Sequence, residues 1–421
     1  MRAAALIAAV AAAPIAAVAA AGPGMPGRLA FAAPAGMTPQ LTSVSGAGVG
    51  VSSARVAVGP EPDGSAVDLD VSVFTPGTGG RQPAVLLAHG FGGSKADLSV
   101  RATDLASHGY VVLTYTARGF GASGGRVHLD DPAFEVADAR RLIDLLAGRP
   151  DVRLDGPGDP KVAIIGTSYG GALALMTAGT DRRVDALVPA ITWNDLSAAF
   201  FPQSAAGPQG APTPAGTAPI GRPGPLKALW ASSFFQSPLV SPGPAVASGA
   251  GVSPDILCGR FDPVLCRLFT TALQTGRSSD ELLTALRAHS PAPSLGAVRA
   301  PTLLIQGMAD SLFGLDQADA TARALAAAGT PVAVRWIDGG HDGASSTATA
   351  DDAAAQAWVD HYLRGATPTS ALAVPAFVYA DPIPRRSSAA PLRSLAAYPG
   401  LGAAPSLTRV ALPLKAAEPQ T

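Results

Sequence analysis

The chain carries a serine whose surroundings suit nucleophilic chemistry. Residues 166–170 read Gly-Thr-Ser168-Tyr-Gly, between the apolar run 162–165 and a helix-forming stretch that continues to residue 178. In such a turn the serine takes a strained backbone conformation at the tip of a buried strand, which exposes its hydroxyl, and the flanking glycines permit the tight bend. The pattern predicts Ser168 as a nucleophile.

A second serine, Ser123 in Gly-Ala-Ser-Gly-Gly, fits the same five-residue pattern. The pattern alone is weak evidence in a chain with 47 glycines among 421 residues. No helix-forming stretch follows Ser123, whereas one follows Ser168. This context favours Ser168 and predicts a glycine-rich loop whose serine, Ser123, only caps or lines the site.

A serine hydroxyl is protonated at neutral pH, so it needs a base and a group that orients the base. Asp310 follows the apolar run 302–306, and His341 follows the next run, 332–337. Loops at the carboxyl ends of neighbouring parallel strands meet at one edge of a sheet. We therefore expect a Ser168, Asp310, His341 triad. Four competitors have other uses, since they sit at helix starts, at helix ends, in the last helix or before glycines: Asp316, Asp338, His108 and His361.

A tetrahedral intermediate also needs hydrogen-bond donors for its oxyanion. The stretch His-Gly-Phe91-Gly-Gly follows the run 84–88, so the backbone amides of Phe91 and Tyr169 are the candidates. An ordinary strand-to-helix turn would look the same as this stretch. Three further side chains are candidates for lining the site: His89, Arg118 and Trp193. Arg118 could equally hold loops together.

Strand and helix patterns alternate along the chain, which predicts an α/β fold with a mostly parallel sheet and helices on both faces. The expected strands are 67–74, 84–88, 110–115, 162–165, 186–190, 302–306 and 332–337. The expected helices are 95–107, 133–146, 168–178, 315–328 and 351–363. The strand, the tight turn at Ser168 and the helix after it together predict the α/β-hydrolase fold.

The pattern divides the chain into six segments. We expect a signal peptide at 1–21, a loosely held Gly/Pro/Ala-rich segment at 22–64, core at 65–193 and 296–369, and a helical cap inserted at 194–295. Residues 370–421 form an extension that could begin a truncated β-sandwich. The apolar run 3–21 predicts export and cleavage, with a retained membrane anchor as the alternative.

The chain has two cysteines, Cys258 and Cys266, only eight positions apart. In an exported protein this pair predicts a small disulfide loop, and two buried free thiols are the alternative. The segment has too few ligands for a metal site, and we expect no metal and no cofactor. Charged residues make up 14% of the chain and the net charge is −1, which excludes a basic nucleic-acid surface.

Five motifs together resemble the Xaa-Pro dipeptidyl-peptidase and cocaine-esterase-like group, over about residues 65–365: His-Gly-Phe-Gly-Gly, Ala-Arg-Gly-Phe-Gly-Ala-Ser-Gly-Gly, Gly-Thr-Ser-Tyr-Gly-Gly, Thr-Trp-Asn-Asp-Leu and Gly-Gly-His-Asp-Gly. The resemblance implies Ser168, Asp310 and His341 as the triad, a helical cap, and hydrolysis of an ester or of an amide after proline. In that group a tyrosine hydroxyl can contribute to the oxyanion hole, whereas this chain has Phe91. The group also commonly has a carboxyl-terminal jelly roll, of which 370–421 would be only the beginning.

The sequence thus predicts a secreted or cell-envelope serine hydrolase that acts on a small ester or a short peptide, with no stable membrane insertion after signal cleavage. An acyltransferase or a lipase-like esterase on the same fold is the alternative. A non-catalytic binding protein is a third interpretation, because fold does not dictate activity. No residue is assigned to capture a free amino terminus, so the choice between ester and amide stays open.

Overall fold

The computed structural model describes residues 48–202, 224–240, 258–366, 374–381 and 389–401. The predicted signal peptide, 1–21, lies outside these residues. Within the described ranges, no helix is both long enough and apolar enough to cross a membrane.

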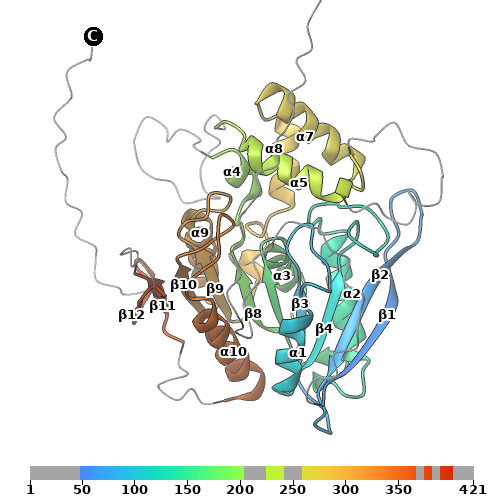
Figure 1. The fold of residues 1–421 in the computed structure, drawn as a ribbon, viewed down its shortest axis with the longest axis vertical. Helices are drawn as coiled ribbons and strands as arrows, with labels where there is room; N and C mark the ends of the chain where they lie inside the picture. The colour runs from blue at the N-terminus through green and yellow to red at the C-terminus, as the bar shows by residue number, and fades with distance from the viewer. Residues whose placement is uncertain (1–47, 203–223, 241–257, 367–373, 382–388, 402–421) are drawn as a thin grey trace, which may run out of the picture.

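A single ten-stranded sheet forms the centre of the described part of the chain (Figure 1). From one edge to the other, the strands are β1 (Gly50–Val58), β2 (Val67–Thr75), β4 (Val111–Thr116), β3 (Ala84–Ala88), β7 (Val162–Thr167), β8 (Val184–Ala190), β9 (Thr302–Gly307), β10 (Val332–Ile337), β11 (Phe377–Ala380) and β12 (Leu392–Leu395). The strands β4, β3, β7, β8, β9, β10 and β11 are parallel to one another. At the edges, β1, β2 and β12 pair antiparallel. A short hairpin, β5 (Leu154–Gly156) and β6 (Asp159–Pro160), stands apart.

The central strands are mostly apolar and are buried because both of their faces are covered. Every residue of β3, β4 and β9 is buried. Helices α1 (Ser99–Ser107) and α10 (Ala348–Arg364) pack on one face of the sheet. Helices α2 (Glu135–Ala147), α3 (Tyr169–Thr180) and α9 (Leu315–Ala327) pack on the other. The predicted α/β fold with a mostly parallel sheet is confirmed.

In the described residues, four α-helices lie between β8 and β9, in the segment 194–295 that the sequence predicts as a cap and that we call the cap. They are α4 (Leu196–Phe200), α5 (Ala228–Val240), α7 (Pro263–Thr275) and α8 (Asp280–Ala288). In Figure 1 they gather at one end of the sheet, above the carboxyl ends of the parallel strands. Asp262 starts α7 by accepting hydrogen bonds from two amides of its first turn, at 2.9 and 3.0 Å, and Pro263 occupies the first helical position.

One end of the sheet differs from the sequence prediction. Residues 50–58 were expected to be loosely held, but β1 pairs with β2 along its whole length. Most of β1 is exposed, so its sequence lacks the apolar alternation that reveals a strand. At the other end, β11 and β12 pair with the central sheet, and the expectation that 370–421 begins a β-sandwich stays a prediction. The remainder of 370–421 lies largely outside the described residues.

Candidate active site

Ser168 occupies a sharp turn between β7 and α3. Its backbone has φ 55° and ψ −114°, a conformation that residues other than glycine rarely adopt. A Cβ on Gly166 would lie 2.0 Å from the carbonyl oxygen of Gly170, and a Cβ on Gly170 would lie 2.3 Å from the carbonyl oxygen of Ala88 on β3. Both positions therefore require glycine, since the turn folds back on itself and presses against the neighbouring strand.

A chain of hydrogen bonds joins Ser168, His341 and Asp310. The Nε2 atom of His341 lies 2.8 Å from Ser168 Oγ, and its Nδ1 lies 2.7 Å from Asp310 Oδ2. The other carboxylate oxygen of Asp310 accepts hydrogen bonds from the amides of Leu312 and Phe313, at 3.0 and 2.8 Å. Because the carboxylate accepts the proton of Nδ1, Nε2 is left with a lone pair that faces the serine hydroxyl. The three residues come from the loops that follow β7, β9 and β10.

The competing acids and histidines have partners elsewhere. Asp338 accepts a serine hydroxyl and a serine amide in its own loop, both at 2.9 Å, and Asp316 accepts the side-chain amide of the next residue, at 2.9 Å. His108 and His361 each place Nδ1 beside a nearby backbone carbonyl, at 2.8 and 2.9 Å. These hydrogen-bond partners of the four residues therefore lie outside the Ser168 site, and Asp316 does not cap α9, although its sequence position predicts a cap.

Ser123, the rival serine, is a buried structural residue. Its Oγ donates to the carbonyl of Thr116 on β4, at 2.6 Å, and accepts the amide of Asp70 on β2, at 2.8 Å. Ser123 therefore joins the glycine-rich loop that follows β4 to the strands β4 and β2.

The side chains of the two candidate oxyanion residues, Phe91 and Tyr169, belong to one aromatic cluster. Tyr169 is the first residue of α3, where the helix dipole favours negative charge. Among the described residues, no acceptor takes the amide of Tyr169 or that of Phe91. The Phe91 ring packs edge-on against the rings of Phe120 and Tyr169, with centroid distances of 5.0 and 5.4 Å. Both amides are therefore available as donors.

His89, a predicted lining residue, holds the Phe91 loop. It is buried, and its Nε2 accepts the amide of Ala117, at 2.9 Å. Its Nδ1 therefore carries the proton and donates to the carbonyl of Gly90, at 2.7 Å. Burial lowers the pKa of His89, so the ring stays neutral.

Arg118 and Trp193, the other two lining candidates, are also buried. Both carboxylate oxygens of Asp138 accept from the Arg118 guanidinium, each at 2.6 Å, and Glu61 accepts at 3.3 Å. These bonds tie the segment before β2 to α2, so Arg118 holds loops together. The Trp193 indole donates to a carbonyl at 3.2 Å, and its ring packs on Phe313, which in turn packs on His341.

Sequence reasoning missed the side chains that join the cap to the loop after Asp310, and that loop to the His341 loop. The ammonium group of Lys227 donates to two carbonyls of the loop after Asp310, at 2.8 and 2.7 Å. The indole of Trp230 donates to Ser311 Oγ, at 3.0 Å, and its ring lies 5.9 Å from the His341 ring. Asp342 accepts the Ser311 amide and hydroxyl, at 2.6 and 2.7 Å. These contacts join segments that are distant in sequence, and no local pattern marks them.

A cavity of about 570 Å³ lies away from this site, between the loop 128–134 and helices α7 and α8. Its walls include His128, Asp131, Phe134 and His289, and the triad does not contribute to them. Asp131 and His289 are paired across it, at 3.1 Å. The cavity is therefore separate from the candidate active site.

The model of one protein family, described as X-Pro dipeptidyl-peptidase (S15 family), matches residues 63–341. This chain belongs to that family. The match includes β2, the Ser168 turn, the cap, Asp310 and His341. Family membership and the sheet order together place the chain among the serine hydrolases with the α/β-hydrolase fold.

Curated relatives match over shorter stretches. The quorum-quenching protein AidA of Acinetobacter baumannii is 28% identical over 142 residues, which are 32% of this chain and 43% of AidA. An uncharacterized protein of Mycobacterium tuberculosis is 32% identical over 179 residues, 42% of this chain and 57% of the relative. The chain thus spans about half the length of these relatives.

Among solved structures, an acetyl xylan esterase from Paenibacillus sp. R4 is similar, with a TM-score of 0.47 and 17% identity over 76% of this chain and 87% of the esterase. An acylaminoacyl peptidase of Pyrococcus horikoshii gives a TM-score of 0.42 and 16% identity, over 69% of this chain and 38% of the peptidase.

Proposed function

We propose that the protein hydrolyses an ester or amide bond through an acyl-enzyme formed on Ser168. The hydrogen-bonded chain from Ser168 Oγ through His341 to Asp310 supports this most directly. Membership of the X-Pro dipeptidyl-peptidase family supports the same chemistry. The proposed bond is an ester or an amide, and the proposed amides include one that follows proline.

Each group would have a defined part in the reaction. Ser168 Oγ attacks the carbonyl carbon while its proton passes to His341 Nε2, and the Asp310 carboxylate stabilises the imidazolium. The amides of Phe91 and Tyr169 donate to the oxyanion. When the intermediate collapses, His341 returns the proton to the departing alcohol or amine and the acyl group stays on Ser168. Water then repeats the sequence, which releases the acid and restores the serine.

The surroundings of Ser168 favour a substrate with an apolar part. Trp230 from α5 is half-buried, and its ring lies 5.9 Å from that of His341. Phe91 is also half-buried, and its ring packs against that of Tyr169, the residue after Ser168. A polar substrate group placed there would lose water without gaining hydrogen bonds. Transfer of the acyl group to an alcohol is the second candidate, since the acyl-enzyme is common to both reactions.

Labelling with a fluorophosphonate tests the proposal. The reagent phosphonylates an activated serine, so peptide mapping should find the adduct on the peptide that contains Ser168. Ser168→Ala should remove the adduct, and a fluorophosphonate adduct that persists in this variant would contradict the assignment. Acetyl and long-chain nitrophenyl esters, compared with an Xaa-Pro nitroanilide, then separate esterase from peptidase activity. Added alcohols reveal acyl transfer.

We also propose that the protein is exported. The apolar leader supports this, and so does the disulfide between Cys258 and Cys266, because disulfides persist in oxidising compartments. Amino-terminal sequencing of protein from the culture medium or cell envelope should find a start close to residue 22. A start at residue 1 would contradict cleavage.

A further inference from the structure

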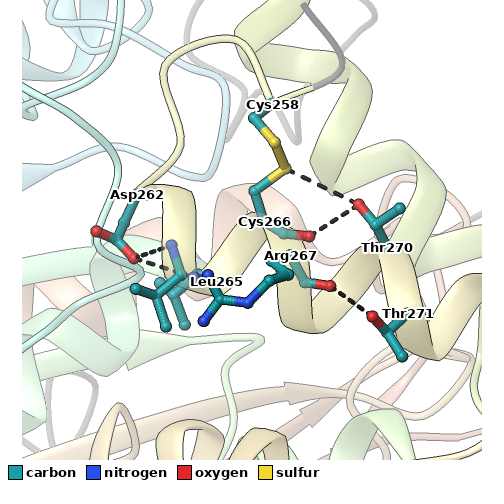
Figure 2. The surroundings of a disulfide bond; sticks show 8 residues. Cys258, Asp262, Leu265, Cys266, Arg267, Thr270 and Thr271 are labelled. Carbon is teal, nitrogen blue, oxygen red and sulfur yellow. Dashed lines mark hydrogen bonds between the residues drawn. A yellow bond between two sulfur atoms is a disulfide. The ribbon is translucent and has the colours of Figure 1, made fainter. Parts of the chain in front are cut away.

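The disulfide closes a short loop of the cap. Cys258 and Cys266 are eight positions apart, and Cys266 lies in the first turn of α7, where it is fully buried. Figure 2 shows the disulfide joining the start of the loop to α7, with Asp262 at the beginning of the helix. The loop is therefore held at both ends, by the disulfide and by the helix cap. Between these ends it presents Arg260 and Phe261 to the core.

Arg260 fastens this loop to the glycine-rich loop that follows β4. Its guanidinium donates to three backbone carbonyls, those of Gly121, Ser123 and Gly125, the first at 3.0 Å and the last at 3.1 Å. Two backbone bonds add to this contact: the Val127 amide donates to the Arg260 carbonyl, at 2.7 Å, and the Asp262 amide donates to the Val127 carbonyl, at 3.0 Å. The cap loop thus forms a parallel bridge with the core.

Phe261, the next residue of the cap loop, packs against Phe91. The two rings are stacked, with centroids 5.8 Å apart and planes 24° apart, and only 3% of Phe261 is exposed. Phe234 on α5 lies 4.5 Å from Phe91. The cap therefore supplies two of the rings around Phe91, and the core supplies the rings of Phe120 and Tyr169.

We propose that Arg260 and Phe261 are positioning residues for the oxyanion hole, held in place by the Cys258–Cys266 disulfide. This inference rests on the proposed function, in which the Phe91 amide donates to the oxyanion. A donor stabilises the transition state only when it lies about 2.7–3.1 Å from the oxyanion. Phe91 lies on a loop that His89 holds through the Gly90 carbonyl, and the rings packed around the Phe91 side chain add a second restraint on the position of its backbone amide.

The proposal makes a specific kinetic prediction. An oxyanion contact is made in the transition state and not with the bound substrate, so its loss lowers kcat and leaves KM nearly unchanged. Removal of a whole oxyanion donor costs roughly 10²–10³ in kcat. A displaced donor should cost less, so we expect Phe261→Ala to lower kcat about 10- to 50-fold with 4-nitrophenyl acetate. Phe261→Tyr, which keeps the ring, should recover most of the rate.

Leu268→Ala is the matched control. Leu268 is also a buried apolar residue of the cap, but it lines the cavity beneath α7 and α8. This variant should lose stability as Phe261→Ala does, while its kcat stays within about twofold of wild type. Thermal unfolding of both variants, measured on the full chain, separates the effect on cap stability from the effect on the reaction.

The possible results differ clearly. A folded Phe261→Ala with wild-type kcat, or an equal loss of kcat in both alanine variants, would overturn the positioning role while leaving Ser168-dependent hydrolysis in place. Absence of Ser168-dependent turnover in the wild type would instead overturn the proposed function. If Phe261→Ala does not fold, the double variant Cys258→Ser, Cys266→Ser replaces it. The same fall in kcat at constant KM is then expected, and an unchanged kcat would overturn the proposal.

Discussion

At the scale of single residues, Asp310 determines which nitrogen of His341 carries the proton. One of its oxygens accepts two backbone amides, and the other faces His341 Nδ1. An asparagine at this position would turn its carbonyl toward the two amides and its NH₂ toward Nδ1. The proton of the ring would then move to Nε2, which faces Ser168 and could no longer accept the serine proton.

Asp310→Asn should therefore lower kcat by roughly 10³–10⁴ with little change in the fold. The measurement is steady-state hydrolysis of 4-nitrophenyl acetate near pH 8, alongside circular dichroism. A folded variant within about tenfold of wild type would show that Asp310 does not orient the base.

Asp130 gives a prediction about pH and stability. It is fully buried, and burial, with the nearby Glu135 as a smaller cause, raises its pKa well above the ordinary value of 3.8. The folded protein therefore holds this proton more tightly than the unfolded chain. The stabilisation is complete below the unfolded pKa and is lost as the pH rises toward the folded pKa.

Asp130→Asn should make the free energy of unfolding fall less between pH 5 and pH 8, by on the order of 1 kcal/mol or more. Asparagine also tolerates the left-handed backbone at this position, where φ is 59°. Some pH dependence should remain, because burial also raises the pKa of Glu135 to about 8. Urea unfolding at the two pH values measures this, and equal pH dependence in variant and wild type would contradict it.

At the scale of elements, the close contact between β3 and α3 holds the serine turn. A Cβ on Gly170 would meet the carbonyl oxygen and carbon of Ala88 at 2.3 and 2.6 Å, and this backbone is in the middle of the sheet. Neither side can move without disturbing the strand pairing. Gly170, two residues after Ser168, is therefore required by the packing as well as by the turn.

Gly170→Ala should lower the free energy of unfolding by roughly 3 kcal/mol or prevent folding. Gly296→Ala is the control, because a Cβ there meets nothing within 4 Å, and its effect should stay within about 0.5 kcal/mol. Chemical denaturation of the two variants compares them. Equal stabilities would show that the turn has more room than the contacts indicate.

Elements with a local pattern could be predicted from the sequence. The runs 84–88 and 332–337 match β3 and β10 residue for residue. The first is continuously apolar, as buried parallel strands are, and the second is apolar apart from Arg335. The helix expected from residue 95 begins at Ser99, because Lys95 uses its amide and ammonium group to bind β4 and β2. The strand β1 was missed because an exposed edge strand has no apolar alternation. The helix α7 was missed although its buried residues Leu265, Leu268, Phe269 and Ala272 recur at helical spacing, because the two cysteines favour the interpretation of the segment as a disulfide loop.

The site divides in the same way. Ser168, Asp310 and His341 could be named because each follows a recognisable strand and chemistry restricts the residue types. His89, Arg118 and Trp193 could be placed near the loops, but their buried contacts were not visible in the sequence. Lys227, Trp230 and Asp342 could not be found, since their partners lie in loops that only the folded chain brings together.

At the scale of the whole molecule, the parallel sheet brings three loops to one edge and the cap covers them. The Ser168 turn follows β7 in the middle of the sheet, and the loops of Asp310 and His341 follow β9 and β10. The cap reaches this edge at two places, through Lys227 and Trp230 near Asp310 and through Arg260 and Phe261 near Phe91. The cap thus contacts both the loop that follows Asp310 and the ring of Phe91 in the proposed oxyanion loop.

The most direct test of this account compares the two serines that share the Gly-x-Ser-x-Gly pattern. With 4-nitrophenyl acetate as substrate, Ser168→Ala should reduce turnover to near the uncatalysed rate, apart from the residual effect of binding and oxyanion contacts. Ser123→Ala removes a buried bridge between β2 and β4, so it should lose stability but keep kcat within a few-fold of wild type. Wild-type turnover by Ser168→Ala, or its loss in a folded Ser123→Ala, would contradict Ser168 as the nucleophile.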